Sequence, residues 1–154
     1  MLKNGIKAPN FTLNITPEQQ ISLSELIGKK VILAFYPADW SSVCGSEMTI
    51  FNTSVKLLEK YNAVVLGISV DSKWSHKAFS EKLQLHFSLL SDFEPKGAVS
   101  QLYDVYDLSQ GCSKRAIYII DEKGIIQWSS LSPNEINPGI DGVLDALDKL
   151  ATEQ

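Results

Sequence analysis

Two cysteines, Cys44 and Cys112, carry the most reactive side chains of this 154-residue sequence. Cys44 lies between an unbroken apolar run, Val31–Tyr36, and a segment in which apolar residues recur at helical spacing. The first turn of a helix presents unpaired N–H groups and the positive end of the helix dipole, and both favour a thiolate over a thiol. We therefore predict that Cys44 is a nucleophile, with an inert buried thiol as the alternative.

The residues just before Cys44 favour the nucleophile. Pro37 stops the preceding strand because proline has no backbone N–H to donate. Ser41 places a hydroxyl beside the sulfur, where it can donate to the sulfur or to an incoming oxygen, and it can also cap the helix. The backbone N–H groups of Val43 and Cys44 are further donors to negative charge that develops near the sulfur.

Apolar runs and helical patterns alternate around this segment and predict an α/β fold with a central mixed sheet flanked by helices. Strands are expected at Phe11–Ile15 on an edge and at Val31–Tyr36, Val64–Val70, Ala116–Asp121 and Ile125–Ser129. Helices are expected at Leu23–Ile27, from Cys44 to about Tyr61, from a cap at Ser72 or Ser75, at Lys96–Tyr103 and at Ile140–Leu150. The last two strands form a hairpin, Pro95 opens its helix, and Ser130–Gly139 is a surface loop.

Charge and composition argue against several functions. The net charge is −4 and no basic cluster occurs, so we expect no nucleic-acid partner. No apolar window is long enough to span a membrane, and the N-terminal residues lack the apolar core of a signal peptide. We therefore expect a cytoplasmic protein that forms a single domain over residues 1–154. The cysteines and histidines show no metal-ligand spacing, and no metal or other cofactor is expected.

Four segments resemble peroxiredoxins, in the group of alkyl hydroperoxide reductase E and the bacterioferritin-comigratory proteins. Pro37, Ser41 and Cys44 match the active-site motif of the family, Pro-x-x-x-(Thr/Ser)-x-x-Cys. The other three segments are Ala8–Phe11, Leu90–Val99 and Lys114–Ala116. The resemblance covers nearly the whole chain and implies a thioredoxin-like fold.

The resemblance also implies roles for individual residues. Cys44 resembles the peroxidatic cysteine, Ser41 replaces the commoner threonine, and Pro37 shields the thiolate. Arg115 resembles the second active-site arginine, whose guanidinium approaches the sulfur. Glu47 resembles the acidic or amide residue that orients this arginine, with an ordinary carboxylate in the first helical turn as the alternative.

The implied reaction is the reduction of hydrogen peroxide or an organic hydroperoxide by Cys44, which becomes a sulfenic acid. A thiol reductant then restores the cysteine, and this partner would be thioredoxin, glutaredoxin or a low-molecular-weight thiol. Cys112 is either a resolving cysteine or a small apolar loop residue. We favour the second reading and thus a one-cysteine mode. A homodimer through the face around the active-site loop is expected, with Trp40 near the site or that interface.

Two other functions remain open on the same fold. A thiol–disulfide oxidoreductase would normally use Cys-x-x-Cys, but the position three after Cys44 holds Glu47. A peroxide-sensing redox relay would oxidise a partner protein instead of turning over with a small thiol. A cysteine hydrolase would need a histidine base. We instead expect His76 and His86 to be surface or helix-face residues, Trp74 and Tyr36 to be core residues, and Asp39 to be a solvated turn residue.

Overall fold

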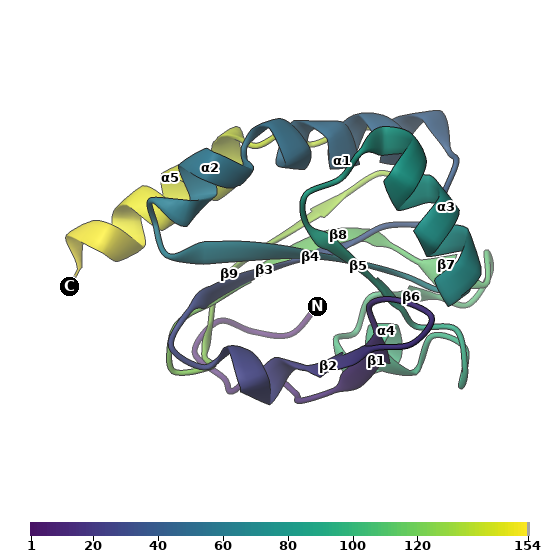
Figure 1. Ribbon diagram of the computed structural model, residues 1–154. Helices are drawn as coiled ribbons and strands as arrows, with labels where there is room; N and C mark the ends of the chain where they lie inside the picture. Colours follow the sequence, from purple (N-terminus) through teal and green to yellow (C-terminus); the bar gives the residue numbers. More distant parts are fainter. Residues whose placement is uncertain (154) are drawn as a thin grey trace.

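The computed structural model describes residues 1–153 and shows a mixed sheet between two layers (Figure 1). Seven strands pair in the order β2-β1-β5-β4-β3-β8-β9, and β6 pairs with β7 in a second, two-stranded sheet. The strands are β1 (Thr12–Asn14), β2 (Gln20–Ser22), β3 (Lys30–Phe35), β4 (Ala63–Ser69), β5 (Ser88–Ser91), β6 (Tyr106–Asp107), β7 (Cys112–Ser113), β8 (Arg115–Ile120) and β9 (Ile126–Ser132). The helices are the 3-10 helix η1 (Leu23–Leu26), α1 (Ser42–Thr53), α2 (Val55–Glu59), α3 (Lys73–Leu83), α4 (Ala98–Leu102) and α5 (Asp141–Thr152). The α/β class and the mixed sheet are as predicted.

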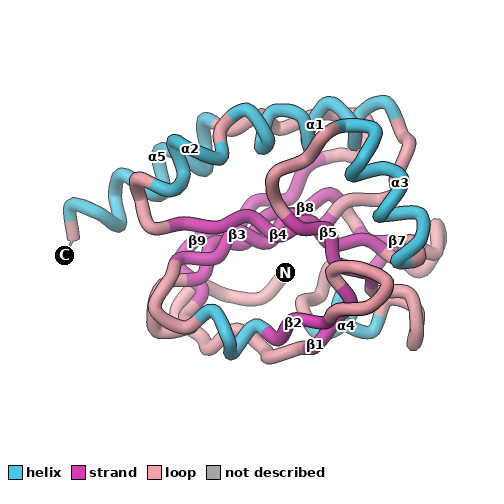
Figure 2. The backbone as a smooth tube through the Cα atoms, viewed as in Figure 1, coloured by secondary structure: helices cyan, strands magenta, loops and turns pink. Residues whose placement is uncertain are grey.

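The central strand β3 is buried on both faces, as its apolar sequence predicts. It pairs in parallel with β4 and antiparallel with β8. Because successive side chains of a strand point to opposite faces, Leu33 and Phe35 join the core beneath η1 and α4. Ile32 and Ala34 instead pack under α1, α3 and α5. Figure 2 shows these helices, with α2, along one side of the sheet. Cys44 belongs to this second core.

One prediction about strands is wrong. The strand at β1 is not an edge strand, because β2 pairs with it on one side and β5 on the other. Four short strands, β2, β5, β6 and β7, were not predicted, because two to four residues are too few to show alternation. The strands β3, β4 and β8 lie where they were predicted. The strand predicted at Ile125–Ser129 corresponds to β9, which extends to Ser132 and so takes the first residues of the expected loop.

Two predictions about helices also need correction. The helix that follows Cys44 divides at Ser54 into α1 and α2, since the Ser54 hydroxyl donates to the Ile50 carbonyl at 2.8 Å and competes with the helical pattern. Pro95 does not open α4, which begins at Ala98. The buried Asp92 carboxylate accepts from the first-turn N–H groups of α4, so the turn that contains Pro95 precedes the helix. In the described part of the chain, the helices are too short to cross a membrane.

Candidate active site

The start of α1 places Cys44 in the first helical turn, as predicted. Ser41 is the N-cap, and its Oγ accepts from the backbone N–H of Cys44 at 3.2 Å. Gly45 N–H donates to the Ser41 carbonyl at 2.9 Å, which begins the helical bonding. Since Ser41 Oγ accepts here, its own O–H remains a donor. The Cys44 N–H, which the sequence suggested as a donor to the reacting atoms, is thus used by the cap.

Arg115 lies beside Cys44 because β8 pairs with β3. The register places Ala116 opposite Phe35, so Arg115 opens β8 next to the end of β3. Its Nη2 donates to Cys44 Sγ at 3.2 Å. The arginine is 1% exposed and the cysteine 0%. A residue distant in sequence therefore supplies a buried cation to the sulfur, which is the position that the family resemblance implied for Arg115.

Two further groups hold the guanidinium. Nη1 of Arg115 donates to Glu47 Oε1 at 2.7 Å, and the carboxylate is 1% exposed. Nε and Nη2 donate to the backbone carbonyl of Asn134 at 3.2 and 2.8 Å. Glu47 therefore pairs with the arginine, as its role implies. Asn134 was missed, because any residue type provides a carbonyl and its segment appeared to be only a surface loop.

Two acidic side chains in this site share a single cationic partner. Cys44 and Glu47 share one guanidinium, and Glu47 Oε2 is buried without a hydrogen-bond partner among the described residues. Burial raises the pKa of Glu47 above its usual value, although Arg115 acts in the opposite direction. Burial alone would lower the pKa of Arg115, but the bonds to Cys44 and Glu47 raise it. The arginine stays charged, while the carboxyl is biased towards its neutral form.

Pro37 and Val43 lie where the sequence placed them. The half-buried Pro37 follows β3 after Tyr36, and Val43 is the second residue of α1. Tyr36 is fully buried, as expected, and burial raises its pKa well above the usual value. Trp40, immediately before the cap, is 56% exposed.

Three predictions about neighbouring residues are wrong. Asp39 is a buried residue and not a solvated one, because it accepts hydrogen bonds from Tyr36 and from α3. His76 is buried with it, whereas His86 is exposed as expected. Trp74 is 61% exposed and does not pack in the core, since α3 turns His76 and Phe79 inwards and Trp74 outwards.

Cys112 lies at the start of β7 as a half-buried free thiol. Burial raises its pKa, and the nearby charges of Asp107 and Cys44 raise it further. The two thiols are therefore within electrostatic reach of each other. A raised pKa lowers the thiolate fraction of Cys112, which weakens it as a nucleophile.

Comparison with known proteins agrees with this geometry. Residues 5–129 match the model of the AhpC/TSA family. The chain belongs to this family. It is 36% identical to 2-Cys peroxiredoxin BAS1 of Hordeum vulgare, over 95% of this chain and 74% of that protein. It is 34% identical to alkyl hydroperoxide reductase E of Mycobacterium bovis, over 88% of this chain and 90% of that protein.

Comparison with solved structures agrees with the family match. This structure matches the reduced 2-Cys peroxiredoxin of Plasmodium vivax with a TM-score of 0.89 and 30% sequence identity, over 97% of this chain and 82% of that one. The thioredoxin-like fold implied by the motif is confirmed. This peroxiredoxin is a thiol-dependent peroxidase, and the oxidoreductase and relay readings are not favoured.

Proposed function

We propose that Cys44 is the peroxidatic cysteine and that Arg115 is the cation that stabilises the transferred charge. The observation that carries this assignment is the 3.2 Å hydrogen bond from Arg115 Nη2 to Cys44 Sγ in a buried site. A cation that donates to sulfur favours the thiolate, and burial strengthens the interaction. The position of Cys44 in the first turn of α1 adds the helix dipole in the same sense.

The proposed step is a displacement at oxygen. The sulfur of Cys44 forms a bond to one peroxide oxygen while the O–O bond breaks, and the electron pair leaves with the other oxygen. That oxygen takes up a proton and departs as water or an alcohol. The sulfur is oxidised to sulfenic acid and the peroxide is reduced. Negative charge thus moves from sulfur to the leaving oxygen, and catalysis requires donors where that charge arrives.

Three groups provide donors that suit these requirements. Arg115 is held at both ends of its guanidinium by Glu47 and the Asn134 carbonyl, which presents its donors in a fixed plane. The Ser41 O–H and the Val43 N–H are the further proposed donors, since both lie at the start of α1. Pro37 has no N–H to donate, and its proposed role is the shielding of the thiolate that the family motif implies.

We propose a one-cysteine mode for the next step, in which an external thiol reduces the sulfenic acid. The raised pKa of Cys112 supports this mode, since a neutral thiol attacks slowly. The reductant is thioredoxin, glutaredoxin or a low-molecular-weight thiol. The cytoplasmic location stays a prediction, and the Hordeum vulgare relative bears a chloroplastic name.

A homodimer remains part of the proposal. Among the large apolar side chains that the described residues expose are those of Trp40, Trp74, Phe93 and Leu108. Trp74 and Phe93 line one hollow of about 300 Å³, and Trp40 adjoins the Ser41 cap. Exposed apolar surface of this kind favours an interface, and a second copy offers the matching surface. Light scattering should give a dimer mass for the wild type and a monomer mass for Trp74→Glu combined with Phe93→Glu.

Rapid mixing with hydrogen peroxide tests the assignment of Cys44. Tryptophan fluorescence follows the rate of the reaction. Intact mass should show the gain of one oxygen in the wild type. Cys44→Ser should abolish the reaction, while Cys112→Ser, the matched control, should oxidise at the wild-type rate. Oxidation that persists in Cys44→Ser would contradict the proposal. A loss of two hydrogens in place of the oxygen gain would show a Cys44–Cys112 disulfide and refute the one-cysteine mode.

A further inference from the structure

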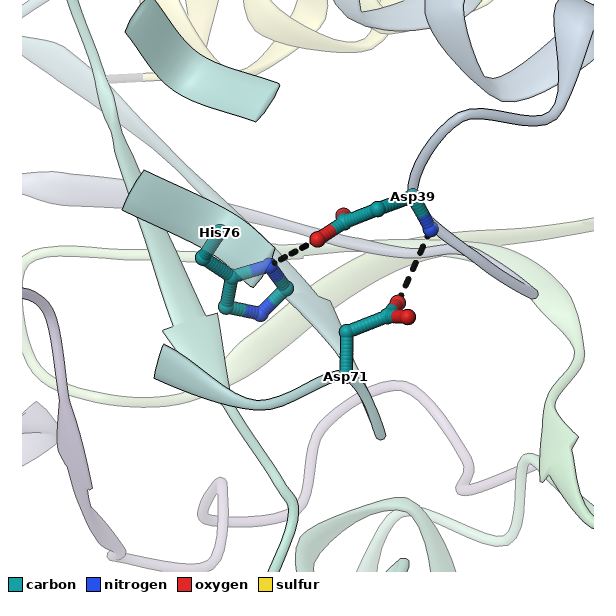
Figure 3. Close-up of side chains that lie close together, drawn as sticks. All are labelled: Asp39, Asp71 and His76. Atoms are coloured by element: carbon teal, nitrogen blue, oxygen red, sulfur yellow. Dashed lines mark hydrogen bonds and ion pairs between the residues drawn. The ribbon is translucent and has the colours of Figure 1, made fainter. Parts of the chain in front are cut away.

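A buried polar network is built on the segment between β3 and Cys44 (Figure 3). The carboxylate of Asp39 accepts from three side chains, two of which belong to α3. Tyr36 O–H donates to Oδ1 at 2.6 Å, and Ser75 O–H donates to Oδ2 at 2.9 Å. His76 Nδ1 lies 2.8 Å from the same Oδ2. Asp39 is buried, and His76 is only 3% exposed. The segment is therefore tied to α3 through one buried carboxylate.

Both ring nitrogens of His76 have a buried partner. Nδ1 lies 2.8 Å from Oδ2 of Asp39, and Nε2 lies 2.9 Å from the backbone carbonyl of Leu90. A buried polar group is tolerated when it is hydrogen-bonded, and this imidazole is bonded at both ends. The Asp39–His76 pair thus joins β5 and α3 to the Cys44 segment.

Hydrogen bonding accounts for a cluster that superficially resembles a metal site. Asp39, Asp71 and His76 offer three ligand atoms within 4.8 Å of one another. Oδ2 of Asp71, however, already accepts from the Asp39 backbone N–H at 2.9 Å and from the Ser69 hydroxyl. The Asp39 oxygens are likewise used by hydroxyl and imidazole donors. The cluster is a matched set of donors and acceptors, and its role follows from what it holds in place.

What it holds is a strained stretch of backbone next to the nucleophile. Trp40, the residue after Asp39, has a φ of 71°, in the left-handed region that bulky side chains rarely adopt. Its ring packs against Phe79 of α3, with ring centroids 5.2 Å apart. Ser41 comes next and caps α1 through the Cys44 N–H. Only Trp40 therefore separates the Asp39–His76 pair from the cap that orients the cysteine.

We propose that Asp39 and His76 are positioning residues for peroxide reduction, which hold the Ser41 cap and thereby the Cys44 sulfur against Arg115. This inference rests on the proposed role of Cys44. Neither residue touches the reacting atoms. Without the bond from His76, the strain at Trp40 opposes the reactive conformation, and the sulfur spends less time in line with an incoming peroxide. Misplacement of a reacting group by about 1 Å can cost on the order of 100-fold in rate.

Two substitutions of His76 separate its two bonds. The amide nitrogen of asparagine occupies roughly the place of Nδ1, whereas that of glutamine occupies roughly the place of Nε2. His76→Asn thus keeps a donor for Asp39, and His76→Gln keeps a donor only for the Leu90 carbonyl. We expect His76→Gln to slow the second-order oxidation of Cys44 by hydrogen peroxide by about 10-fold to 100-fold. His76→Asn should recover most of the rate, and His86→Gln is the matched control with an exposed histidine.

Hydrogen exchange provides a readout that activity alone does not. The backbone N–H groups of Asp39 and Cys44 are bonded to Asp71 and Ser41, and they should exchange faster in His76→Gln but not in His76→Asn. Asp39→Asn keeps the size of the side chain and serves if a histidine variant fails to fold. It should slow oxidation similarly, and its combination with His76→Gln should add little further loss, because both remove the same contact.

Several outcomes would overturn the inference. Equal rates for His76→Gln and the wild type, or equal losses in His76→Gln and His76→Asn, would show that the bond to Asp39 does not position the cysteine. A lower unfolding temperature with an unchanged oxidation rate would show a structural role only. A wild-type protein whose Cys44 is not oxidised by peroxide would instead contradict the assignment of Cys44, and so separates the two failures.

Discussion

Replacement of Arg115 by lysine is the most direct probe of how this site uses charge. Arg115 donates four hydrogen bonds, one to Cys44 Sγ, one to Glu47 and two to the Asn134 carbonyl. Lysine keeps the positive charge but concentrates it on a single nitrogen, and it lacks the planar fork that spans these partners. Arg115→Lys therefore retains the sign of the charge and removes its geometry.

The size of the effect follows from the loss of a donor placed where charge develops. Loss of one such group in other enzymes costs about 100-fold to 1,000-fold in rate, or about 2.7–4 kcal/mol of transition-state stabilisation. Arg115 and Cys44 are buried, so the hydrogen bond between them lies in a region of low effective dielectric. We therefore apply the same range of rate loss to this bond. We expect the rate constant for Cys44 oxidation in Arg115→Lys to fall by about 100-fold or more.

The assay must separate the amount of thiolate from its reactivity. Alkylation of Cys44 by iodoacetamide across a pH series gives the thiolate fraction, and rapid mixing with hydrogen peroxide gives the oxidation rate at each pH. Lys114→Gln is the control, since it removes the neighbouring cation without touching the site. If Arg115→Lys oxidises within about threefold of the wild type at equal thiolate, the geometry of the guanidinium is unimportant and our reasoning fails.

Three further predictions concern the side chains of Glu47, Asp92 and Ser41. Because the pKa of Glu47 is raised in the folded state, its contribution to stability is present at low pH and is lost as pH rises through the raised value. Glu47→Gln should remove this fall from urea unfolding curves measured between about pH 4 and 7, and an unchanged pH dependence would contradict it. Asp92→Ala should lower the free energy of unfolding by about 2 kcal/mol, since it leaves the N–H groups of Val99 and Ser100 unpaired; a loss within urea-titration error would be inconsistent. Ser41→Ala should slow Cys44 oxidation by about 10-fold while Ser41→Thr does not, and equal rates for the two would show that the hydroxyl is dispensable.

Much of the site could be predicted because its residues are identified by type. A cysteine in the first turn of a helix has few roles, and a serine three residues earlier suits a cap. Arg115 was predicted from its resemblance to a family motif, and the pairing of β3 with β8 explains why it reaches the sulfur. Strands with unbroken apolar sequence, such as β3, were predicted because burial on both faces requires such a sequence.

The supporting residues were not predictable by the same reasoning. Asn134 contributes a backbone carbonyl, which the residue type does not reveal. Asp39 and His76 are polar, and polar residues in turns and on short helices are usually exposed. Their burial depends on each other, because each supplies the partner that makes burial of the other tolerable. Such mutual dependence between distant positions does not appear in the local pattern of either segment.

The register between β3 and β8 also determines which insertions and deletions the active site can tolerate. Side chains of a strand alternate between its faces, and Arg115 shares the face of Ile117 and Ile119 that packs under α1. A slip of β8 by one residue would turn the guanidinium to the opposite layer and bring Ala116 or Lys114 to the sulfur. Insertions in the turn after β8 leave this register intact, whereas one residue gained or lost inside β8 would separate the thiol from its cation. The strand pairing thus sets which changes of length the site tolerates, because a change in the turn between β8 and β9 leaves Arg115 on its face of the sheet and a change inside β8 does not.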